Sequence, residues 1–389
     1  MTQSAPPPFT FETVATDGDA RAGVLHTPHG PVLTPTFMPV GTTGAVKTML
    51  PEEVRSTGAQ IVLGNTYHLW LRPGAEVVAA HGGLHGFSHW EGAMLTDSGG
   101  FQAFSLDDKC KRTEDGYIFR SHLDGSKHHL SPEEAMRVQR LLGADIAMQL
   151  DVCPPGGSPA RDVEEAVAMT TRWARRCLEA KRRADEEEGP DGQGVFGIVQ
   201  GGTDRALRRA HADELAGLEV EGKGFAGLAL GGFSVGEPIE VMHEVLAAVA
   251  PAVDPARARY LMGVGKPADL VVGIAAGIDM FDCVLPTRNG RNGQVLTRTG
   301  RIIIRHARYK NDQEVLEPGC GCPACAGGYT RAYLRHLFMS NEMLSMRLFT
   351  HHNLHLYGRL VAEARRAILD GRFAAFQTET LERLSTPQT

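Results

Sequence analysis

The sequence predicts an α/β fold in which a (β/α)8 TIM barrel is followed by a C-terminal zinc-binding subdomain. Eight short segments are nearly continuously apolar, which is typical of strands buried on both faces of a parallel sheet. Helical patterns separate most of them, and this alternation over about 250 residues fits a closed barrel better than an open doubly wound sheet. Cys320, Cys322 and Cys325 lie close together beyond the last of these segments and indicate a metal site there.

The strands and helices follow in order along the chain. The strands are expected at residues 34–40, 61–65, 93–97, 145–151, 195–200, 224–230, 259–264 and 279–284. The longer helices are expected at residues 160–188, 203–217, 237–250 and 266–276, with Gly277 at the C-cap of the last. Another helix is expected after Ser131, because Pro132 stands at the first helical position and Glu134 completes the pattern of a capping box.

Composition limits the class of protein. The 389 residues are 42% hydrophobic, enough for a large core, and 40 basic against 46 acidic residues give a net charge of −6. Any contact with nucleic acid must therefore be local. No apolar stretch approaches the roughly 18 residues of a membrane span, and the start lacks the features of a secretory signal, so we expect a cytoplasmic protein without a membrane contact.

We expect four parts along the chain. They are a disordered N-terminal tail (1–10), the catalytic barrel (11–285), a basic hairpin with the zinc-binding subdomain (286–360), and a C-terminal helix and tail (361–389). The three consecutive prolines near the start favour the tail.

Polar residues follow the predicted strands and carry the functional signal. They are Asn65, Asp97, Asp151, Gln200, the pair Gly231-Gly232, Gly263 and Asp282. Each alone is compatible with an ordinary turn residue. In a barrel, however, these positions converge on the C-terminal mouth, where active sites lie.

Two motifs contain acidic residues suited to catalysis. In LTDSGGFQ (95–102), Asp97 precedes a Ser-Gly-Gly turn that lets backbone approach a ligand, and Phe101 offers a flat face to a planar base; a purely structural or phosphate-binding turn is the alternative. In the second motif, Asp282 stands between Phe281 and Cys283. A carboxylate in such an apolar setting is costly to desolvate and is often functional.

A local basic strip follows Asp282. Between residues 283 and 311 there is no acidic residue, and seven side chains are positive: Arg288, Arg291, Arg298, Arg301, Arg305, Arg308 and Lys310. A hairpin with one solvated basic face is the plain interpretation, and contact with RNA phosphates is the functional one. We favour phosphate contact because the strip adjoins the predicted site.

The cysteine cluster reads C-x-C-x-x-C and needs a fourth ligand for tetrahedral zinc. His336, His351, His352 and His355 are the candidates, and spacing does not separate them. No H-x-H pair occurs in the chain, so a catalytic zinc at the barrel mouth is disfavoured and a structural zinc is expected.

Two or more aspartates, a stacking aromatic ring and a basic strip suggest nucleophilic displacement at a sugar. One carboxylate would attack the anomeric carbon while another handles the proton of the leaving group. If the leaving base is replaced by another base rather than by water, the enzyme is a transglycosylase.

From about residue 10 to about 376 the chain resembles the bacterial tRNA-guanine transglycosylases, or queuine tRNA-ribosyltransferases. The resemblance rests on GNTYHLWLRPG (64–74), LTDSGGFQ, SHLDGSKHHLSPE (121–133), FGIVQGG (196–202), YLMGVGKP (260–267), DMFDCVLPTRNGRNG (279–293) and the cysteine motif with HNLH downstream. It implies a homodimer that exchanges the wobble guanine of tRNAs with a G-U-N anticodon for 7-aminomethyl-7-deazaguanine.

The resemblance also implies roles for single residues. Asp282 corresponds to the nucleophile and Asp97 to the general acid/base. Base recognition falls to Asp151, Gln200 and Gly232, stacking on the base to Phe101 and Met262, and zinc binding to Cys320, Cys322, Cys325 and His352. Arg288 and Arg291 are the expected RNA contacts.

The chain departs from the family pattern at three positions. Phe101 replaces a usual Tyr, Phe233 a usual Leu, and Val152 a usual Glu. Cys153 and Val235 match bacterial members, which favours the small base over queuine. Two other functions remain as alternatives: a non-catalytic tRNA-binding partner subunit, which should have lost the acids, and a zinc hydrolase on the same barrel.

Overall fold

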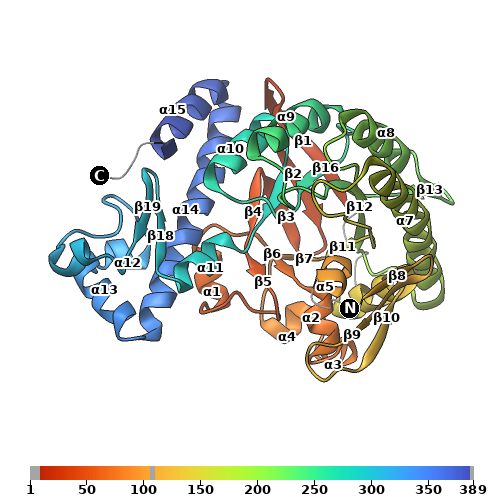
Figure 1. Cartoon of the computed structure of the whole chain (residues 1–389), viewed down its shortest axis with the longest axis horizontal. Helices are drawn as coiled ribbons and strands as arrows, with labels where there is room; N and C mark the ends of the chain where they lie inside the picture. Colours follow the sequence, from red (N-terminus) through yellow and green to blue (C-terminus); the bar gives the residue numbers. More distant parts are fainter. Residues whose placement is uncertain (1–8, 106–109, 386–389) are drawn as a thin grey trace, which may run out of the picture.

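A computed structural model describes residues 9–105 and 110–385, and at its centre lies a closed parallel sheet (Figure 1). The sheet order is β4-β17-β16-β15-β12-β11-β7-β6-β5, and each of its recorded strand pairings is parallel. The strands are β4 (Thr36–Met38), β5 (Val40–Gly41), β6 (Ile61–Gly64), β7 (Ala93–Thr96), β11 (Ile146–Met148), β12 (Gly194–Val199), β15 (Gly227–Leu230), β16 (Ala258–Leu261) and β17 (Met280–Asp282). The predicted (β/α)8 barrel is confirmed.

All eight predicted strands are present, each shorter than expected or shifted by a residue. The first is divided into β4 and β5 at Pro39, which has no N–H to donate to a neighbouring strand. β4 pairs with β17 and β5 pairs with β6, so the two halves together close the barrel.

Helices cover the outside of the sheet. Those before the last strand are α1 (Pro51–Ser56), α2 (Thr66–Leu71), α3 (Ala75–Ala80), α4 (Gly83–Ser88), α5 (Gly100–Ser105), α6 (Pro132–Leu142), α7 (Ala160–Glu188), α8 (Arg205–Ala216), α9 (Ile239–Val249) and α10 (Pro267–Ala275). Ser131 accepts the Glu134 N–H as the N-cap of α6, but the Glu134 carboxylate pairs with Arg137, so only half of the predicted capping box forms. Ala276 is the C-cap of α10, and Gly277 follows it with a φ of 86°.

The segment after β17 forms the subdomain and then returns to the barrel. It contains α11 (Leu285–Arg291), the hairpin β18 (Gln294–Thr297) and β19 (Gly300–Ile303), α12 (Pro323–Ala326), α13 (Arg331–Met339), α14 (Met343–Leu369) and α15 (Phe373–Ser385). Helix α14 lies between the subdomain and the strands (Figure 1), and the Tyr357 ring packs 4.5 Å from that of Phe37 on β4. α14 therefore packs against both the barrel and the subdomain. It continues without a break past residue 360, where we expected the subdomain to end.

Three small antiparallel sheets were not predicted. They are β1 (Thr10–Asp17), β2 (Ala20–Thr27) and β3 (Gly30–Thr34); β8 (Lys111–Thr113), β9 (Gly116–Arg120) and β10 (Lys127–Leu130); and β13 (Glu219–Val220) with β14 (Lys223–Gly224). β1 begins at Thr10, the last residue of the predicted N-terminal tail. Residues 1–8 of that tail and residues 386–389 of the C-terminal tail lie outside the described residues.

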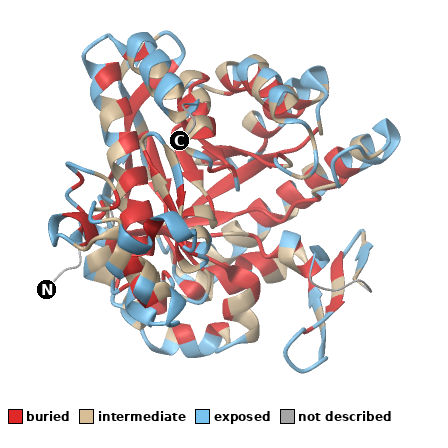
Figure 2. Ribbon diagram, turned by 60° about the vertical axis from the view of Figure 1, so that its left-hand side comes forward, coloured by how far each residue is buried: buried red, intermediate tan, exposed pale blue. Residues whose placement is uncertain are grey.

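Two apolar layers hold the barrel together. The inner layer takes alternate residues from the barrel strands, such as Ile61, Leu63, Met280 and Phe196, with Leu25 and Val32 of the β2–β3 hairpin. The outer layer lies between strands and helices. Buried residues fill the strands and the inner faces of the helices (Figure 2). None of the described helices combines the length and apolar character that a membrane span needs.

Candidate active site

A cleft of about 820 Å³ opens at the carboxyl ends of the barrel strands. Its lining includes eight of the residues to which the resemblance gives a role: Asp97, Phe101, Asp151, Gln200, Gly232, Met262, Asp282 and Arg288. Asn65, Gly231 and Gly263, predicted from their places after strands, line it as well. They come from positions spread over the whole barrel sequence, and the parallel sheet brings their strand ends to one face.

The period-two geometry of a strand explains why four of these side chains point into the cleft. On β17, Met280 faces the barrel interior and Phe281 faces the helices, so Asp282 continues the inner row. The same alternation leads from Leu95 to Asp97, from Ile198 to Gln200 and from Tyr260 to Met262.

Asp151 reaches the cleft by a different route. Pairing of β11 ends at Met148, and Leu150 belongs to the outer layer, so the strand alternation does not continue to Asp151. The Tyr117 hydroxyl donates to the Asp151 carbonyl at 3.0 Å from β9, outside the barrel. A residue distant in the sequence thus fixes the backbone here.

Asp282 is held through one of its two carboxylate oxygens. Oδ1 accepts the Tyr260 hydroxyl and the Gly263 N–H, each at 2.7 Å. No hydrogen bond to Oδ2 is recorded from residues 9–105 and 110–385, and the residue lines the cleft. Burial raises the pKa of Asp282, while the two donors act against that shift. One oxygen is therefore fixed, and the other is available to a substrate.

Asp97 has donors on both oxygens. The Thr66 N–H donates to Oδ1 at 2.8 Å, and the Asn65 side-chain amide donates to Oδ2. The orientation of Asn65 is fixed because its carbonyl oxygen accepts the His68 N–H as the N-cap of α2. Burial raises the pKa of Asp97 to about 7, and the charges of Asp282 and Asp151 add to this. Asp97 can therefore hold or release a proton near neutral pH.

Asp151 and Gln200 form a second group of polar side chains in the cleft lining. Gln200 Nε2 donates to Asp151 Oδ2 at 2.7 Å, and burial raises the pKa of Asp151 to about 6. Gln200 Oε1 is buried without a hydrogen-bond partner among the described residues. A Cβ at Gly232 would stand 2.4 Å from this oxygen, and the φ of Gly232, 67°, is one that other residues rarely adopt, so both features favour glycine here.

The remaining predicted residues differ in where they lie. Phe101 on α5 is half exposed at the cleft, and Met262 is partly buried. Arg288 and Arg291 lie on helix α11, ahead of the β18–β19 hairpin in the segment predicted as a basic hairpin, and Arg291 is not part of the cleft lining.

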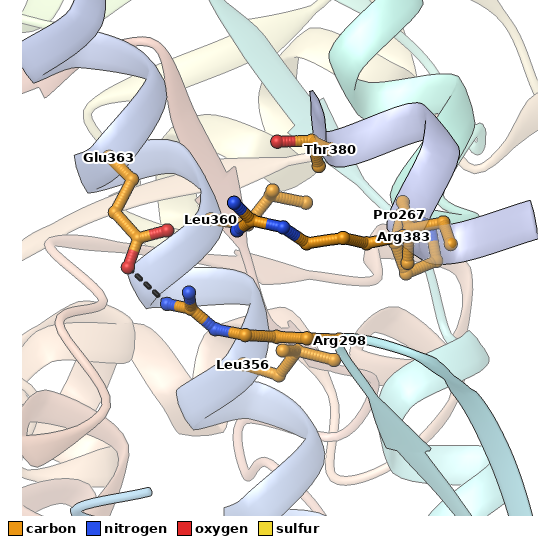
Figure 3. Close-up of a pocket in the computed structure, with 8 residues that line it drawn as sticks. Pro267, Arg298, Leu356, Leu360, Glu363, Thr380 and Arg383 are labelled. Atoms are coloured by element: carbon orange, nitrogen blue, oxygen red, sulfur yellow. Dashed lines mark hydrogen bonds and ion pairs between the residues drawn. The ribbon is translucent and has the colours of Figure 1, made fainter. Parts of the chain in front are cut away.

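One arginine of the basic strip, Arg298, is paired with a carboxylate of the protein itself. Arg298 pairs with Glu363 of α14, and its guanidinium extends beside that of Arg383 into a second, much smaller crevice between α14, α15 and the β18–β19 hairpin (Figure 3). Arg383 in turn pairs with Glu379. The Arg298 pair joins the turn of the hairpin to α14, whereas the Arg383 pair lies within α15, so the Arg298 charge is already paired inside the protein.

The three cysteines and one histidine form a buried group able to hold a metal, which we call the cysteine–histidine group. The sulfur atoms of Cys320, Cys322 and Cys325 lie 3.8, 3.2 and 3.5 Å from His352 Nδ1. His352 Nε2 lies 2.9 Å from the Leu296 carbonyl, to which it can donate while Nδ1 faces the sulfurs. His351 instead lies against Ser56 Oγ at 3.0 Å. Three sulfur donors and one nitrogen donor suit a closed tetrahedral site, and none of the four side chains lines the cleft.

Sequence reasoning missed several residues that support the site. In the sequence Tyr260 looks like an ordinary core aromatic residue. Its position two residues before Met262 in the same predicted strand, however, indicates that its side chain faces the barrel interior, where it contacts Asp282. Arg208 reads as a surface residue of a basic helix but is fully buried. Tyr117 gives no signal in the sequence, since its contact depends on how the β8–β10 sheet packs.

The fold and the cleft define a barrel enzyme with a pair of carboxylates suited to chemistry at a sugar carbon. The model of the family described as queuine tRNA-ribosyltransferase matches residues 17–386. A protein of that name from Sorangium cellulosum is 66% identical over 373 residues, covering 96% of this chain and 91% of the relative. Proteins of the same name from Pelotomaculum thermopropionicum and Geobacillus thermodenitrificans are 53% and 50% identical to this chain. In both comparisons at least 96% of this chain and of the relative is covered.

The chain belongs to the queuine tRNA-ribosyltransferase family. It is accordingly a transglycosylase of the pentosyltransferase class. The resemblance found in the motifs is confirmed over nearly the whole chain.

Proposed function

We propose that this protein is a tRNA-guanine transglycosylase that replaces the wobble guanine of G-U-N tRNAs with 7-aminomethyl-7-deazaguanine. The observation that carries the proposal is the pair of cleft acids: both donors to Asp282 meet at Oδ1, and Asp97 has a donor on each oxygen. Burial raises the pKa of Asp97 to about 7, which suits a group that gives and takes a proton. The similarity to relatives named for ribosyl transfer to tRNA supports the substrate class.

The proposed reaction has two displacements at the ribose C1′ atom. Asp282 Oδ2 attacks C1′ as the bond to guanine N9 breaks, and the departing base takes a proton supplied by Asp97. Asp97 then accepts the N9 proton of the incoming base, which attacks C1′ and releases Asp282. Tyr260 and Gly263 hold Oδ1, which orients the carboxylate for attack.

The remaining residues have proposed roles in binding. Asp151, Gln200 and the Gly232 backbone recognise the base, and the side chains of Phe101 and Met262 enclose it. Cys153 and Val235 in the cleft lining match the residues expected for the small base. Arg288 in the cleft lining and Arg291 one turn further along α11 are proposed to contact the anticodon loop.

We also propose that Cys320, Cys322, Cys325 and His352 hold a structural zinc ion. Zinc would tie the loop carrying the cysteines to α14 and supply no chemistry to the cleft. A homodimer is proposed as well; Tyr333, Met339 and Met343 are exposed on neighbouring parts of α13 and α14, as an apolar interface would require. The site of action would be the cytoplasm.

The alternative is a non-catalytic tRNA-binding partner subunit. It is disfavoured by the presence of both acids with supporting donors, because a chain that only binds RNA has no need to bury two carboxylates. A zinc hydrolase is disfavoured by the separation of the cysteine–histidine group from the cleft.

Incorporation of labelled guanine into an unmodified G-U-N tRNA tests the proposal. Wild-type protein should exchange the base, and Asp282→Asn should reduce exchange by at least about 10³-fold while tRNA affinity stays within a few-fold, the pattern of a lost transition-state contact. A denaturation-resistant tRNA adduct should form with wild type and not with Asp282→Asn. An adduct that persists in Asp282→Asn and vanishes in Asp97→Asn would reverse the two roles.

A further inference from the structure

One corner of the cleft lies on two strand ends that are rich in glycine. It comprises residues 200–202 after β12 and residues 231–233 after β15, and we call it the glycine corner. Gly201, Gly202 and Gly232 have φ values of 144°, 56° and 67°, in the region that favours glycine. Such a backbone is intrinsically mobile unless another group holds it.

Arg208 of α8 is that group. Its guanidinium donates to the carbonyls of Gly202 at 2.6 Å, Gly231 at 2.9 Å and Gly232 at 3.3 Å, and more weakly to that of Val199. These bonds join the ends of two strands through one side chain. Lysine could not reproduce them, because an ammonium group lacks the planar fork of donors.

The arginine is fully buried and its recorded hydrogen-bond acceptors are all backbone carbonyls. The Phe233 ring covers its guanidinium at 3.9 Å from the ring centroid. Burial lowers the pKa of Arg208 to about 10, so the side chain stays charged at neutral pH. A buried charge is costly unless its partners offset that cost, so Arg208 must make these hydrogen bonds for the glycine corner to be stable.

The direction of the carbonyls decides what the corner offers to a ligand. Because the Gly231 and Gly232 carbonyls turn towards Arg208, they do not face the cleft. The Gly232 N–H has no recorded backbone acceptor among the described residues, and the adjacent Gln200 Oε1 is also without a partner. A donor and an acceptor thus stand side by side, a pattern suited to the edge of a purine-like base.

We propose that Arg208 is a positioning residue for base specificity, which sets the glycine corner so that the Gly232 N–H and the Gln200 side chain meet the edge of the base. The inference rests on the proposed base exchange and deepens it. Arg208 touches neither the ribose nor the base and acts through the backbone it holds.

The test is the substitution Arg208→Lys, assayed by guanine incorporation with either guanine or tRNA varied at saturation of the other. The KM for guanine should rise at least ten-fold and by a larger factor than the KM for tRNA, because tRNA is also held through its phosphates, and kcat should fall less than the guanine KM rises. A merely structural role would instead reduce the active fraction, lowering kcat with both KM values unchanged, and that result would overturn the proposal.

Arg209→Lys is the matched control. Arg209 is the next residue of α8, is exposed, and donates to the Ala248 carbonyl away from the cleft. It should give wild-type values. A guanine KM for Arg208→Lys within two-fold of this control would also overturn the proposal.

Phe233→Leu gives a second measurement that does not depend on the folding of Arg208→Lys. Leucine keeps an apolar cover but removes the ring from the guanidinium, so the guanine KM should rise by about two- to five-fold. An unchanged guanine KM in Phe233→Leu would count against the proposed role of Arg208. If wild-type protein fails to exchange guanine, the proposed function fails; if wild type exchanges it and these variants bind guanine normally, only this inference fails.

Discussion

At the scale of single residues, the two cleft aspartates differ in how their oxygens are held. Asp97 has a donor on each oxygen, whereas both donors to Asp282 meet at Oδ1. Sequence reasoning could identify both acids from their places at strand ends. It could not reveal this difference, because Tyr260 and Thr66 act on residues of other segments.

The hydroxyl of Tyr260 should tune the pH dependence of exchange. Its hydrogen bond lowers the pKa of Asp282, against the effect of burial, so Tyr260→Phe should raise that pKa. Since Asp282 must be ionised to attack, the acidic limb of the kcat/KM profile should move to higher pH, and the loss of rate should be largest at the acidic end of the profile. An acidic limb at the wild-type position would show that Tyr260 does not act on the ionising group.

At the scale of elements, apolar runs located every barrel strand, since strands buried on both faces leave that signal. The β1–β3 sheet was missed because most of β1 is exposed and few apolar residues mark it. Helix α11 was not predicted, because Asn and Gly in its Arg-Asn-Gly-Arg sequence favour turns over helices. Gly290 in fact permits close packing on α14, where a Cβ would stand 2.8 Å from the Thr350 nitrogen.

The basic strip should contribute to tRNA affinity by neutralising phosphates. Arg288 and Arg301 are exposed and have no recorded ion pair among the described residues. Replacing both with glutamine should weaken tRNA binding and reduce the slope of log K against log salt by about one unit for each phosphate that is no longer neutralised. Arg175→Gln with Arg183→Gln removes the same charge from α7 and is the control. Equal slopes for the two double variants would place the tRNA on another face.

The cysteine–histidine group should stabilise the elements around it rather than the reaction. Cys322→Ser should lose the bound metal and the local fold of the segment from α12 to α13 together, because the ligands come from two distant segments that the metal would join. Metal content and proteolysis of this segment measure both effects. A metal-free variant that resists proteolysis but has lost only the exchange step would contradict a structural role.

At the scale of the whole molecule, the barrel separates chemistry at its carboxyl end from stability at its amino end. At the amino end, the buried Asp145 carboxylate accepts the backbone N–H groups of His29 and Met94. It also contacts the rings of His29 at 2.9 Å and His85 at 3.2 Å, and the two rings stack 3.5 Å apart. This cluster joins the β2–β3 hairpin to β7, β11 and α4, which sequence patterns could not reveal because its members are spread over widely separated segments.

The same cluster makes the stability of the barrel depend on pH. The hydrogen bond to Asp145 raises the pKa of His29, so the stabilisation from its charged form is complete below about pH 6.5 and is lost as pH rises through the folded-state pKa. Burial works against ionisation of Asp145, but the contacts of His29 and His85 prevail and lower its pKa, so its contribution persists until strongly acidic pH.

His29→Gln should therefore lower the free energy of unfolding most between about pH 5 and 6, and the difference from wild type should shrink towards about pH 8.5. Urea unfolding at both pH values measures this, with His129→Gln, an exposed histidine on β10, as the control. Guanine exchange at a fixed pH should stay at the wild-type rate, because the cluster lies at the opposite end of the barrel from the cleft. A stability difference that grows as the pH rises would mean that His29 is held in its neutral form and that Asp145 relies on backbone donors instead.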